Sequence, residues 1–480
     1  MANVNLTIDG KALSVPAGTT ILEAAKSSGI HIPTLCYLKE LEPHASCRLC
    51  VVEVEGARTF QHSCAAKVRE GMVVHTDTEA VRASRKLTLE LLLSNHSVDC
   101  HHCLRIGSSK CDDLDPRFCE MCFFCDCVKD GFCDLQALAR EYKVDKLPFE
   151  QKHARLPVDS SSPIVRDPNK CIKCKRCADV CGEIQTVHNL AASGRGCEVV
   201  IGPAFLKPMA ESGCIGCGRC VEVCPTGAIF AQEHKDEIVY HAHRADTAAI
   251  ALVDTALIPE LERIWKYKTQ PVTLEQLAGS LKKIGFEAVV DARDAFEMAQ
   301  AEAEKRLDER LKSGPAILAD SAAAQKLLKR DFEAYSERFV FYPSALSVFG
   351  SRAKETFAPD ETKVKTCAFT AIGPETCEAA DTGCVDYVIN ARELYRIMVR
   401  TGAEPHPGRM GQPDRLPHGA PSGKYGKLLE PVRWSMDAEP EVFECTVDGR
   451  ALRCAICRNP AQLRKVLAEA PETDIIRVIA

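Results

Sequence analysis

The sequence has no long apolar run, no apolar leader and no excess of positive charge. No stretch approaches the roughly 20 consecutive apolar residues that a membrane-spanning helix needs. The first residues, Met1 to Leu6, contain neither a basic segment nor an apolar run, so we expect no signal peptide and a cytoplasmic location. The formal net charge of −6 provides no basic surface for binding nucleic acid. These absences indicate a soluble chain that, at 480 residues, is too long for a single core.

Cysteine, in contrast, is abundant, with 27 residues in the chain. In a reducing compartment, cysteines at Cys-x2-Cys spacing indicate metal ligands, whereas in a secreted protein they would indicate disulfides. Most of them lie in the first 230 residues. We therefore expect this part of the chain to carry four or five iron-sulfur clusters.

Residues 1–80 predict a small domain of the β-grasp ferredoxin type. The segment from Val4 to Ile8 alternates between polar and apolar residues, turns at Asp9-Gly10 and then resumes, which predicts a β-hairpin. A helix is expected after Thr20, which has Glu23 at the spacing of a capping box. Four cysteines follow that can hold a [2Fe-2S] cluster, namely Cys36, Cys47, Cys50 and Cys64. A zinc site is the alternative, although zinc favours two Cys-x2-Cys pairs.

Residues 81–145 contain a second ligand motif. Residues 80–95 predict an amphipathic helix that ends just before His96. His96 precedes Cys100 and Cys103 at His-x3-Cys-x2-Cys spacing, and Cys133 opens the sequence Cys-Asp-Leu-Gln. With these motifs, residues 1–140 resemble the N-terminal region shared by [FeFe] hydrogenases and the large peripheral iron-sulfur subunit of NADH dehydrogenase. The resemblance implies that His96, Cys100, Cys103 and Cys133 bind one [4Fe-4S] cluster, and the imidazole is expected to raise its reduction potential.

The gap between Cys103 and Cys133 is longer than in that family, which predicts an insertion. It holds five more cysteines, namely Cys111, Cys119, Cys122, Cys125 and Cys127. Two Cys-x2-Cys steps share Cys122, and with Cys111 or Cys127 in reach they can hold an additional [4Fe-4S] cluster. A zinc site is one alternative. In another, Cys111 replaces Cys133 as a ligand of the histidine-containing cluster.

The next predicted domain is residues 146–235. It begins with a linker at 145–170 that is rich in Pro, Ser and charged residues, and two similar cysteine runs then form an internal repeat. In repeats of the bacterial ferredoxin type, the fourth cysteine of each run binds the cluster of the other run. We assign one [4Fe-4S] cluster to Cys171, Cys174, Cys177 and Cys224, and another to Cys214, Cys217, Cys220 and Cys181. Lys173, Lys175 and Arg176 would suit the docking of an acidic ferredoxin, although solvated charge is the simpler interpretation.

Residues 236–480 alternate between predicted helices and strands, with helices around 257–265 and 274–284 and strands at 288–291 and 316–319. Their order resembles the catalytic domain of [FeFe] hydrogenases, which binds its active-site cluster through cysteines in motifs such as Thr-Ser-Cys, Met-Pro-Cys and Cys-Pro-Gly-Gly-Cys. Residues 319–322 contain no cysteine, Cys367 lacks the proline and lysine of the second motif, and the sequence stops where the last pair is expected. We expect the fold of that domain without its active-site cluster.

The other cysteines of this region are expected to be core thiols, and they are Cys377, Cys384, Cys445, Cys454 and Cys457. Around the Asp448-Gly449 turn, the alternation of residues places Cys445 and Cys454 on the apolar face of a hairpin. A cluster shared by Cys367, Cys377 and Cys384 is the alternative, but their spacing does not support it.

The expected fold class is α+β and multidomain, with a β-grasp [2Fe-2S] domain, a His-Cys cluster domain, a bacterial 2[4Fe-4S] ferredoxin domain and an α/β hydrogenase-like domain. The resemblance implies an electron-transfer subunit of a cytoplasmic, electron-bifurcating, NAD(P)H-linked oxidoreductase of anaerobes, without its own substrate site. Expected partners are an NADH-oxidising flavoprotein subunit, a thioredoxin-like [2Fe-2S] subunit, and either ferredoxin or a separate catalytic subunit of the [NiFe] hydrogenase, formate dehydrogenase or transhydrogenase type. The alternatives are an active [FeFe] hydrogenase, an NADH dehydrogenase subunit and a cluster-assembly protein.

Overall fold

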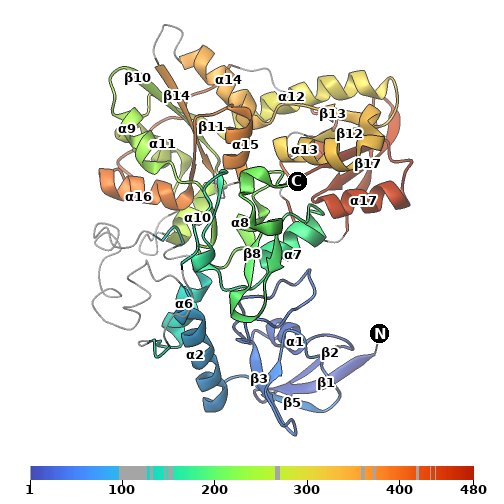
Figure 1. Cartoon of the computed structure of the whole chain (residues 1–480). Coiled ribbons are helices and arrows are strands. Elements are labelled where there is room, and N and C mark those ends of the chain that lie inside the picture. The colour runs from blue at the N-terminus through green and yellow to red at the C-terminus, as the bar shows by residue number, and fades with distance from the viewer. Residues whose placement is uncertain are drawn as a thin grey trace.

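The chain is organised into an N-terminal domain at the bottom of Figure 1, a central cysteine-rich region above it, and two C-terminal lobes that lie side by side at the top. The computed structural model describes residues 2–96, 127–129, 133–144, 147–149, 155–264, 271–319, 321–357, 363–370, 374–417, 421–432, 434–437 and 439–479. No helix within these ranges combines the length and the apolar character that crossing a membrane requires.

The N-terminal domain is a five-stranded sheet of order β2-β1-β5-β3-β4 with one packed helix. Its elements are β1 (Asn3–Ile8), β2 (Lys11–Pro16), α1 (Ile21–Ser27), β3 (Val51–Val54), β4 (Gln61–His62) and β5 (Met72–His75). The predicted hairpin and helix are confirmed. Asp9 and Gly10 make the turn with φ of 47° and 79°, and the Thr20 hydroxyl caps α1 by accepting a hydrogen bond from Glu23 N at 3.2 Å.

Two helices, α2 (Glu79–Ser94) and α6 (Asp134–Glu141), connect this sheet to the central region. The buried Arg85 of α2 donates hydrogen bonds to Val51 O at 2.8 Å and to the Tyr142 hydroxyl at 3.0 Å. Because Val51 belongs to β3 and Tyr142 follows α6, this side chain fixes both helices against the N-terminal sheet. The residues between the two helices lie mostly outside the described ranges.

The central region is closed by β6, which pairs antiparallel with β9 at the other end of the same region. Its elements are β6 (Ile164–Arg166), η1 (Pro168–Lys170), α7 (Arg176–Asp179), η2 (Val180–Ile184), β7 (Ala191–Ser193), η3 (Gly196–Glu198), β8 (Val200–Gly202), η4 (Ala204–Leu206), η5 (Met209–Glu211), α8 (Arg219–Val223) and β9 (Ile229–Ala231). The predicted linker at 145–170 is therefore too long, because β6 already belongs to the packed region. Local composition could not reveal β6, since it is formed by pairing with a distant strand.

The first C-terminal lobe is a parallel four-stranded sheet of order β11-β10-β14-β15. Helices α9, α10, α11 and α16 bury one face of it, and α12, α14 and α15 the other. The elements are α9 (Lys235–Ala242), β10 (Thr247–Val253), α10 (Leu257–Ile264), α11 (Leu274–Ile284), β11 (Ala288–Asp291), α12 (Ala292–Leu311), α14 (Ala345–Phe357), β14 (Lys363–Thr370), α15 (Pro374–Thr382), β15 (Tyr387–Asn390) and α16 (Ala391–Thr401).

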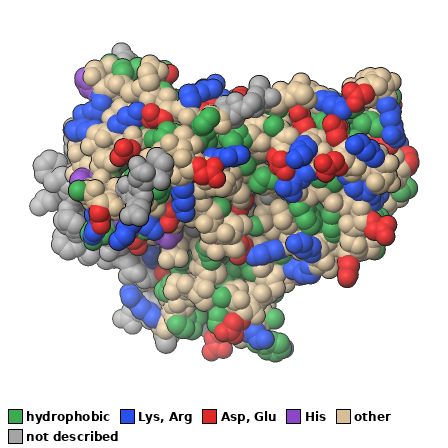
Figure 2. All heavy atoms as spheres, turned by 90° about the horizontal axis from the view of Figure 1, so that it is seen from above, with side chains coloured by type: hydrophobic (Ala, Val, Ile, Leu, Met, Phe, Trp, Pro, Cys, Tyr) green, Lys and Arg blue, Asp and Glu red, His purple; other side chains and the backbone are tan. Residues whose placement is uncertain are grey.

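The second lobe is a five-stranded sheet of order β13-β12-β18-β17-β16, in which only β16 runs antiparallel to its neighbour. Its elements are β12 (Ala316–Ala319), α13 (Ala322–Asp331), η6 (Glu333–Arg338), β13 (Phe339–Phe341), η7 (Gly426–Leu429), β16 (Glu441–Val447), β17 (Arg450–Cys457), α17 (Pro460–Glu469) and β18 (Ile475–Val478). Helix α12 serves both lobes, because Ala295 packs in the first and Leu307 in the second. Seen from above, positive and negative side chains are interspersed over the lobes (Figure 2).

Candidate metal centres

The four cysteines predicted to bind a [2Fe-2S] cluster lie together at the end of the N-terminal sheet that faces the central region. All four side chains are at most 5% exposed. Their thiols form two close pairs. In one, Cys36 contacts Cys47. In the other, the Sγ atoms of Cys50 and Cys64 are 3.3 Å apart. Within each pair, the contact between the two thiols lowers the pKa of one, Cys36 or Cys50, and raises the pKa of the other, Cys47 or Cys64. Two adjacent pairs of buried thiols suit a centre of two iron atoms, each held by two sulfurs.

The eight cysteines of the internal repeat line two cavities in the central region. Cys171, Cys174, Cys177 and Cys224 line the first, and Cys181, Cys214, Cys217 and Cys220 line the second. Each cavity thus combines three thiols of one run with the fourth thiol of the other. Among the described residues, no three potential ligands converge closely enough to hold a single metal ion. The cysteines surround spaces instead, as ligands of a polynuclear cluster would.

The surroundings of these thiols fit a bound cationic group. Burial raises the pKa of Cys171 to about 11 and that of Cys174 to about 12, so a free thiolate is disfavoured there. Backbone N–H groups nevertheless point at sulfur: Lys173 N lies 3.4 Å from Cys171 Sγ, and Asn189 N lies 3.3 Å from Cys181 Sγ. Bound iron supplies the positive charge that keeps such ligands deprotonated. The donor set and its amides therefore fit [4Fe-4S] clusters.

The two cysteine runs share a backbone conformation but differ in sequence. Gly216 and Gly218 of the second run take φ of 76° and 71°, and the equivalent Lys173 and Lys175 of the first run take 58° and 68°. Left-handed conformations cost a residue with a side chain roughly 1–2 kcal/mol, a penalty that glycine avoids. The first run therefore keeps two lysines at positions where glycine would be less strained.

The structure describes only two of the four residues predicted to bind the histidine-containing cluster. His96 is buried just beyond α2. Cys133 is buried at the start of α6, where Asp134 N donates a hydrogen bond to Pro225 O at 2.9 Å. The other predicted ligands of this cluster and of the insertion lie outside the described residues, and they are Cys100, Cys103, Cys111, Cys119, Cys122 and Cys125.

Cys127 was only an alternative by its sequence, yet its position makes it a candidate ligand. It is 4% exposed and shares an apolar cluster with Cys133 and Cys174. Its Sγ lies 3.1 Å from the position that a Cβ would take on Gly227, in the turn after Cys224. The signal that could have identified it is its x5 spacing from Cys133, since the family motif ends with the same spacing.

Continuous packing links the three groups of thiols. One apolar cluster contains Cys36 and Cys47 of the N-terminal domain, Cys127 and Cys133 beside α6, and Cys174 of the central region. A second cluster contains thiols from both cavities of the central region, among them Cys177 and Cys220. The candidate centres therefore follow one another through buried, water-excluding contacts.

Four of the six described cysteines of the lobes are dispersed. Cys367, Cys377, Cys384 and Cys457 belong to four different cores. A cluster shared by Cys367, Cys377 and Cys384 is therefore wrong. Cys445 and Cys454 do share one core, with their Sγ atoms 2.9 Å apart, which confirms their predicted placement on one face of the β16–β17 hairpin.

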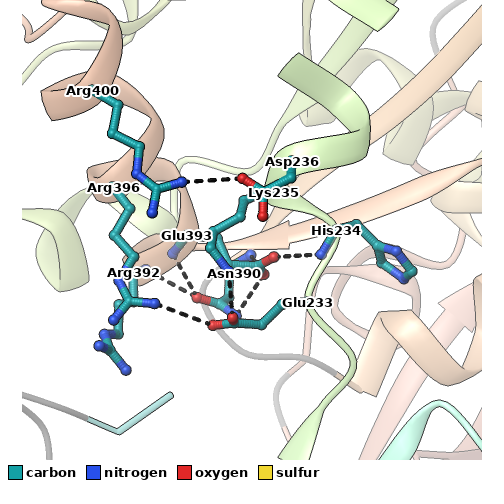
Figure 3. A network of polar contacts seen from close by, with 9 residues as sticks. All are labelled: Glu233, His234, Lys235, Asp236, Asn390, Arg392, Glu393, Arg396 and Arg400. Carbon is teal, nitrogen blue, oxygen red and sulfur yellow. Dashed lines mark hydrogen bonds and ion pairs between the residues drawn. The ribbon is translucent and has the colours of Figure 1, made fainter. Parts of the chain in front are cut away.

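The segment leaving the central region is fixed to the first lobe by a polar network around α16 (Figure 3). The Glu393 carboxylate accepts hydrogen bonds from His234 N at 2.7 Å and from Asn390 Nδ2 at 2.8 Å. Arg400 pairs with Asp236 at 3.1 Å, and Lys235 pairs with Glu233 at 2.6 Å. Burial and the nearby charge of Glu233 raise the pKa of Glu393 to about 8.

Three protein-family profiles match the chain. They describe a 2Fe-2S iron-sulfur cluster binding domain at residues 1–79, a 4Fe-4S binding domain at 210–230, and the C-terminal domain of the iron only hydrogenase large subunit at 248–474. These profiles agree with the N-terminal sheet, the second cysteine run and the two lobes.

Known proteins are similar over different parts of the chain. The NADP-reducing hydrogenase subunit HndD of Solidesulfovibrio fructosivorans is 33% identical over 432 residues, covering 83% of this chain and 69% of HndD. An NADH-quinone oxidoreductase subunit of Rhizobium meliloti is 37% identical over 235 residues, and the NADPH-Fe(3+) oxidoreductase subunit alpha of Geobacter sulfurreducens is 34% identical over 233. The matches to these last two cover 48% of this chain but only 24% of each relative.

A solved structure of an NAD+-reducing [NiFe]-hydrogenase in the H2-reduced state is 29% identical, covers 47% of this chain and 86% of that chain, and has a TM-score of 0.39. The match to HndD covers 83% of this chain, so it includes both the cluster-binding region and the lobes. The chain therefore belongs to the family of [FeFe]-hydrogenase-like iron-sulfur subunits that includes HndD and is related to the large iron-sulfur subunit of NADH dehydrogenase.

Proposed function

We propose that this chain is the electron-distributing subunit of a cytoplasmic, NAD(P)H-linked oxidoreductase complex of the electron-bifurcating kind. It relays electrons between a flavoprotein subunit and either ferredoxin or a separate catalytic subunit, and it has no substrate site of its own. The observation that carries this proposal is the unbroken packing of thiols from three motifs into two neighbouring apolar clusters.

The proposed cofactors follow from the thiol groups. Cys36, Cys47, Cys50 and Cys64 hold a [2Fe-2S] cluster, and the two cavities of the central region hold one [4Fe-4S] cluster each. His96, Cys100, Cys103 and Cys133 hold a third [4Fe-4S] cluster, and the insertion at residues 104–130 holds a further one. When bound, each cluster takes up and releases single electrons. The chain's own residues bury the ligands, and their backbone N–H groups donate hydrogen bonds to the sulfurs. They also exclude water from the space between the sites.

Four proposed domains carry these roles. Residues 1–80 form the [2Fe-2S] domain, 81–145 the His-Cys domain with its insertion, 146–235 the ferredoxin-type domain and 236–480 the hydrogenase-like domain. The packing of β6 against β9 supports an independent unit in the third range. The anchoring of residues 233–236 on α16 supports a boundary at the start of the fourth.

The hydrogenase-like lobes serve as a scaffold in this proposal. Cys367, Cys384 and Cys457 pack in three different cores, and Cys377 packs with thiols of the central region, so these four do not gather around one site within the lobes. After β12, where active hydrogenases carry a cysteine, Ser321 instead caps α13 by accepting a hydrogen bond from Ala324 N at 3.2 Å. Ser321 therefore has a structural role at the start of α13.

The proposed partners rest on the relatives. HndD is named as a subunit of an NADP-reducing hydrogenase, and the Rhizobium and Geobacter relatives as subunits of an NADH-quinone oxidoreductase and an NADPH-Fe(3+) oxidoreductase. These names all refer to a nicotinamide cofactor, which supports a complex in which another subunit oxidises NAD(P)H or reduces NAD(P)+. A flavoprotein accompanied by a thioredoxin-like [2Fe-2S] subunit would have this role. The catalytic partner would be of the [NiFe] hydrogenase, formate dehydrogenase or transhydrogenase type.

The test begins with the native complex, purified without oxygen and analysed by mass spectrometry for its subunits. Hydrogen evolution from reduced viologen is then measured for the complex and for this chain alone. We expect a flavoprotein and a distinct catalytic subunit in the complex, iron and sulfide in the chain, and no hydrogen from the chain alone. Hydrogen from the isolated chain would overturn the scaffold role of the lobes, and a chain without iron would overturn the relay.

A further inference from the structure

The second cavity of the central region is lined by a buried amide that has no hydrogen-bond partner among the described residues. This amide belongs to Gln185, which lines the cavity together with Cys181, Cys214, Cys217 and Cys220. Gln185 is 0% exposed. In the described part of the chain, neither its Nε2 nor its Oε1 atom is hydrogen-bonded. A buried amide left unpaired lowers the stability of a fold, so such a group in a native protein calls for an explanation.

The other polar side chains that line this cavity already have partners. Asn189 Nδ2 contacts Met209 Sδ at 3.9 Å, and Arg219 forms an ion pair with Glu222 at 3.2 Å. The rest of the lining, apart from the four thiols, is apolar and consists of Ile164, Val187, Leu190, Met209 and Ile215. Sulfur, in the thiols and in a cluster that they hold, is therefore the main acceptor that the cavity offers to the Gln185 amide.

The backbone brings Gln185 to the cavity through η2, a π-helical turn that contains Cys181. Gln185 N closes this turn by donating a hydrogen bond to Val180 O at 2.9 Å. Single π-helical turns are frequent at functional sites. At the same distance beyond the fourth cysteine of the other run stands Ala228, which lines the first cavity. The two halves of the repeat thus place different side chains here, an amide in one and a methyl group in the other.

The sign of the effect follows from the charge that a cluster gains on reduction. A one-electron reduction makes the cluster and its thiolates more negative by one unit, so an N–H donor at sulfur stabilises the reduced state more than the oxidised state. The effect is larger in a site that excludes water, because the local dielectric constant is low. A hydrogen bond from Gln185 therefore raises the reduction potential.

We propose that the side-chain amide of Gln185 donates a hydrogen bond to sulfur of the [4Fe-4S] cluster in the second cavity and raises the reduction potential of that cluster. Gln185 tunes the cluster without binding iron, which is left to the four thiols. This inference rests on the proposed function, because it requires a cluster in that cavity.

The test is Gln185→Met in the iron-loaded chain, which keeps an unbranched side chain but removes the N–H donors. Redox titration followed by electron paramagnetic resonance measures the potential, and the signal of the second site is the one that Cys214→Ser alters. We expect the ratio of reduced to oxidised cluster at this site to fall about three- to tenfold at a fixed potential. This is a shift of roughly 30–60 mV to lower potential, at about 59 mV per tenfold for a one-electron couple.

Gln462→Met is the matched control. Gln462 is also 0% exposed, but its amide is paired: Nε2 donates to Asp437 O at 2.6 Å, and Oε1 accepts from Arg458 N at 2.7 Å. This variant should lower the melting temperature, because it leaves these backbone groups unpaired, and should leave the potential of the second site unchanged. Gln185→Met should show the opposite pattern, with a shifted potential and a smaller change in melting temperature.

A spectroscopic measurement on the wild-type chain tests the contact even if a variant folds poorly. The chain is produced with glutamine that carries a nitrogen isotope in its side chain, and electron spin echo modulation is recorded for the reduced second site. We expect the label to change the nitrogen coupling at this site, and Gln185→Met to abolish that change.

A label without effect on the second site would overturn the inference, and the amide would then be paired with a buried water. An unchanged potential in Gln185→Met would also overturn it, as would an equal shift in every cluster. If the wild-type chain gave no [4Fe-4S] signal that Cys214→Ser alters, the proposed function itself would fail, which keeps the two failures distinct.

Discussion

In the central region, Cys181, Cys214, Cys217 and Cys220 surround one cavity, whereas in the first lobe Cys367 packs in a core that contains no other described cysteine. Burial is similar in the central region and in the lobes, and it raises the pKa of Cys457 to about 12, as it does for Cys217. Burial therefore does not distinguish a ligand thiol from a core thiol. What distinguishes them is grouping around a common space, with backbone N–H groups directed at the sulfurs.

The largest expected effect comes from removing one thiol in each region. Cys224→Ala should cost the chain about four iron atoms, because it takes one ligand from the first cavity. Cys367→Ala should leave the iron content unchanged, because Cys367 packs in a core of the first lobe that contains no other described cysteine. Iron and sulfide analysis of both purified variants checks this. Equal losses of iron in the two variants would remove the distinction between the regions.

A core substitution in the lobes should lower stability but leave the iron content unchanged, in contrast to the loss of a ligand thiol. Phe349 of α14 is fully buried in the first lobe. Phe349→Ala should lower the free energy of unfolding of that lobe by about 3–5 kcal/mol, as large-to-small core changes do. The control is Leu87→Ala, because Leu87 of α2 is 48% exposed. We expect this change to lower the free energy of unfolding by about 0.5 kcal/mol or less. Thermal unfolding and iron analysis together test this, and iron loss in Phe349→Ala would show that the lobe supports the clusters.

The stability of the junction between the regions should depend on pH through Glu393. Its folded-state pKa of about 8 lies above the unfolded value of about 4.3, so between these values the folded chain keeps a proton that the unfolded chain has lost. The stabilisation is therefore full below the unfolded pKa and is lost as pH rises through about 8.

Denaturant unfolding at several pH values measures this slope, and Glu393→Gln should flatten it between about pH 5 and 8. Glu309→Gln, at an exposed position of α12, is the control and should keep the wild-type slope. If the Glu393 variant kept that slope as well, another group would be responsible for it.

The smallest expected effect concerns the loop after β12. Ser321→Ala removes the cap of α13 and should cost about 1 kcal/mol of stability. Iron content and the electron paramagnetic resonance signals should stay the same, because Ser321 caps α13 and lines neither cavity of the central region. Altered signals would show instead that this loop still contacts a cofactor, as in active hydrogenases.

The locally encoded elements were predictable. The hairpin through Asp9-Gly10, the helix capped by Thr20 and the helix at Leu274–Ile284 each have their own turn or capping residues, and the structure contains them. The profile matches confirm the ferredoxin-like and hydrogenase-like character of the two ends. For the ligand sets, spacing predicted the grouping of thiols seen around the two cavities, while the identity of the bound clusters stays a prediction.

Features that depend on distant contacts were not predictable. The sequence near β6 does not show that β6 pairs with the distant strand β9. The sequence around Lys173 and Lys175 does not reveal their left-handed backbone, which becomes clear from comparison with the glycines of the second run. Cys127 was set apart as an alternative, because its environment is formed by the turn at Gly227, far along the chain. Likewise, the Glu393 network joins segments whose polar residues look like ordinary surface charge.

The order of strands in the second lobe has a consequence for how the chain is made. Strand β18 lies between β12 and β17, so β12 has its inner edge unpaired until residues 475–478 have left the ribosome. Translation of the intervening stretch takes roughly ten to thirty seconds. During that interval the cysteine motifs are already outside the ribosome, so the machinery that loads iron can act on them before the second lobe closes. The unpaired edge of β12 is meanwhile open to pairing with other chains, which binding by a chaperone would prevent.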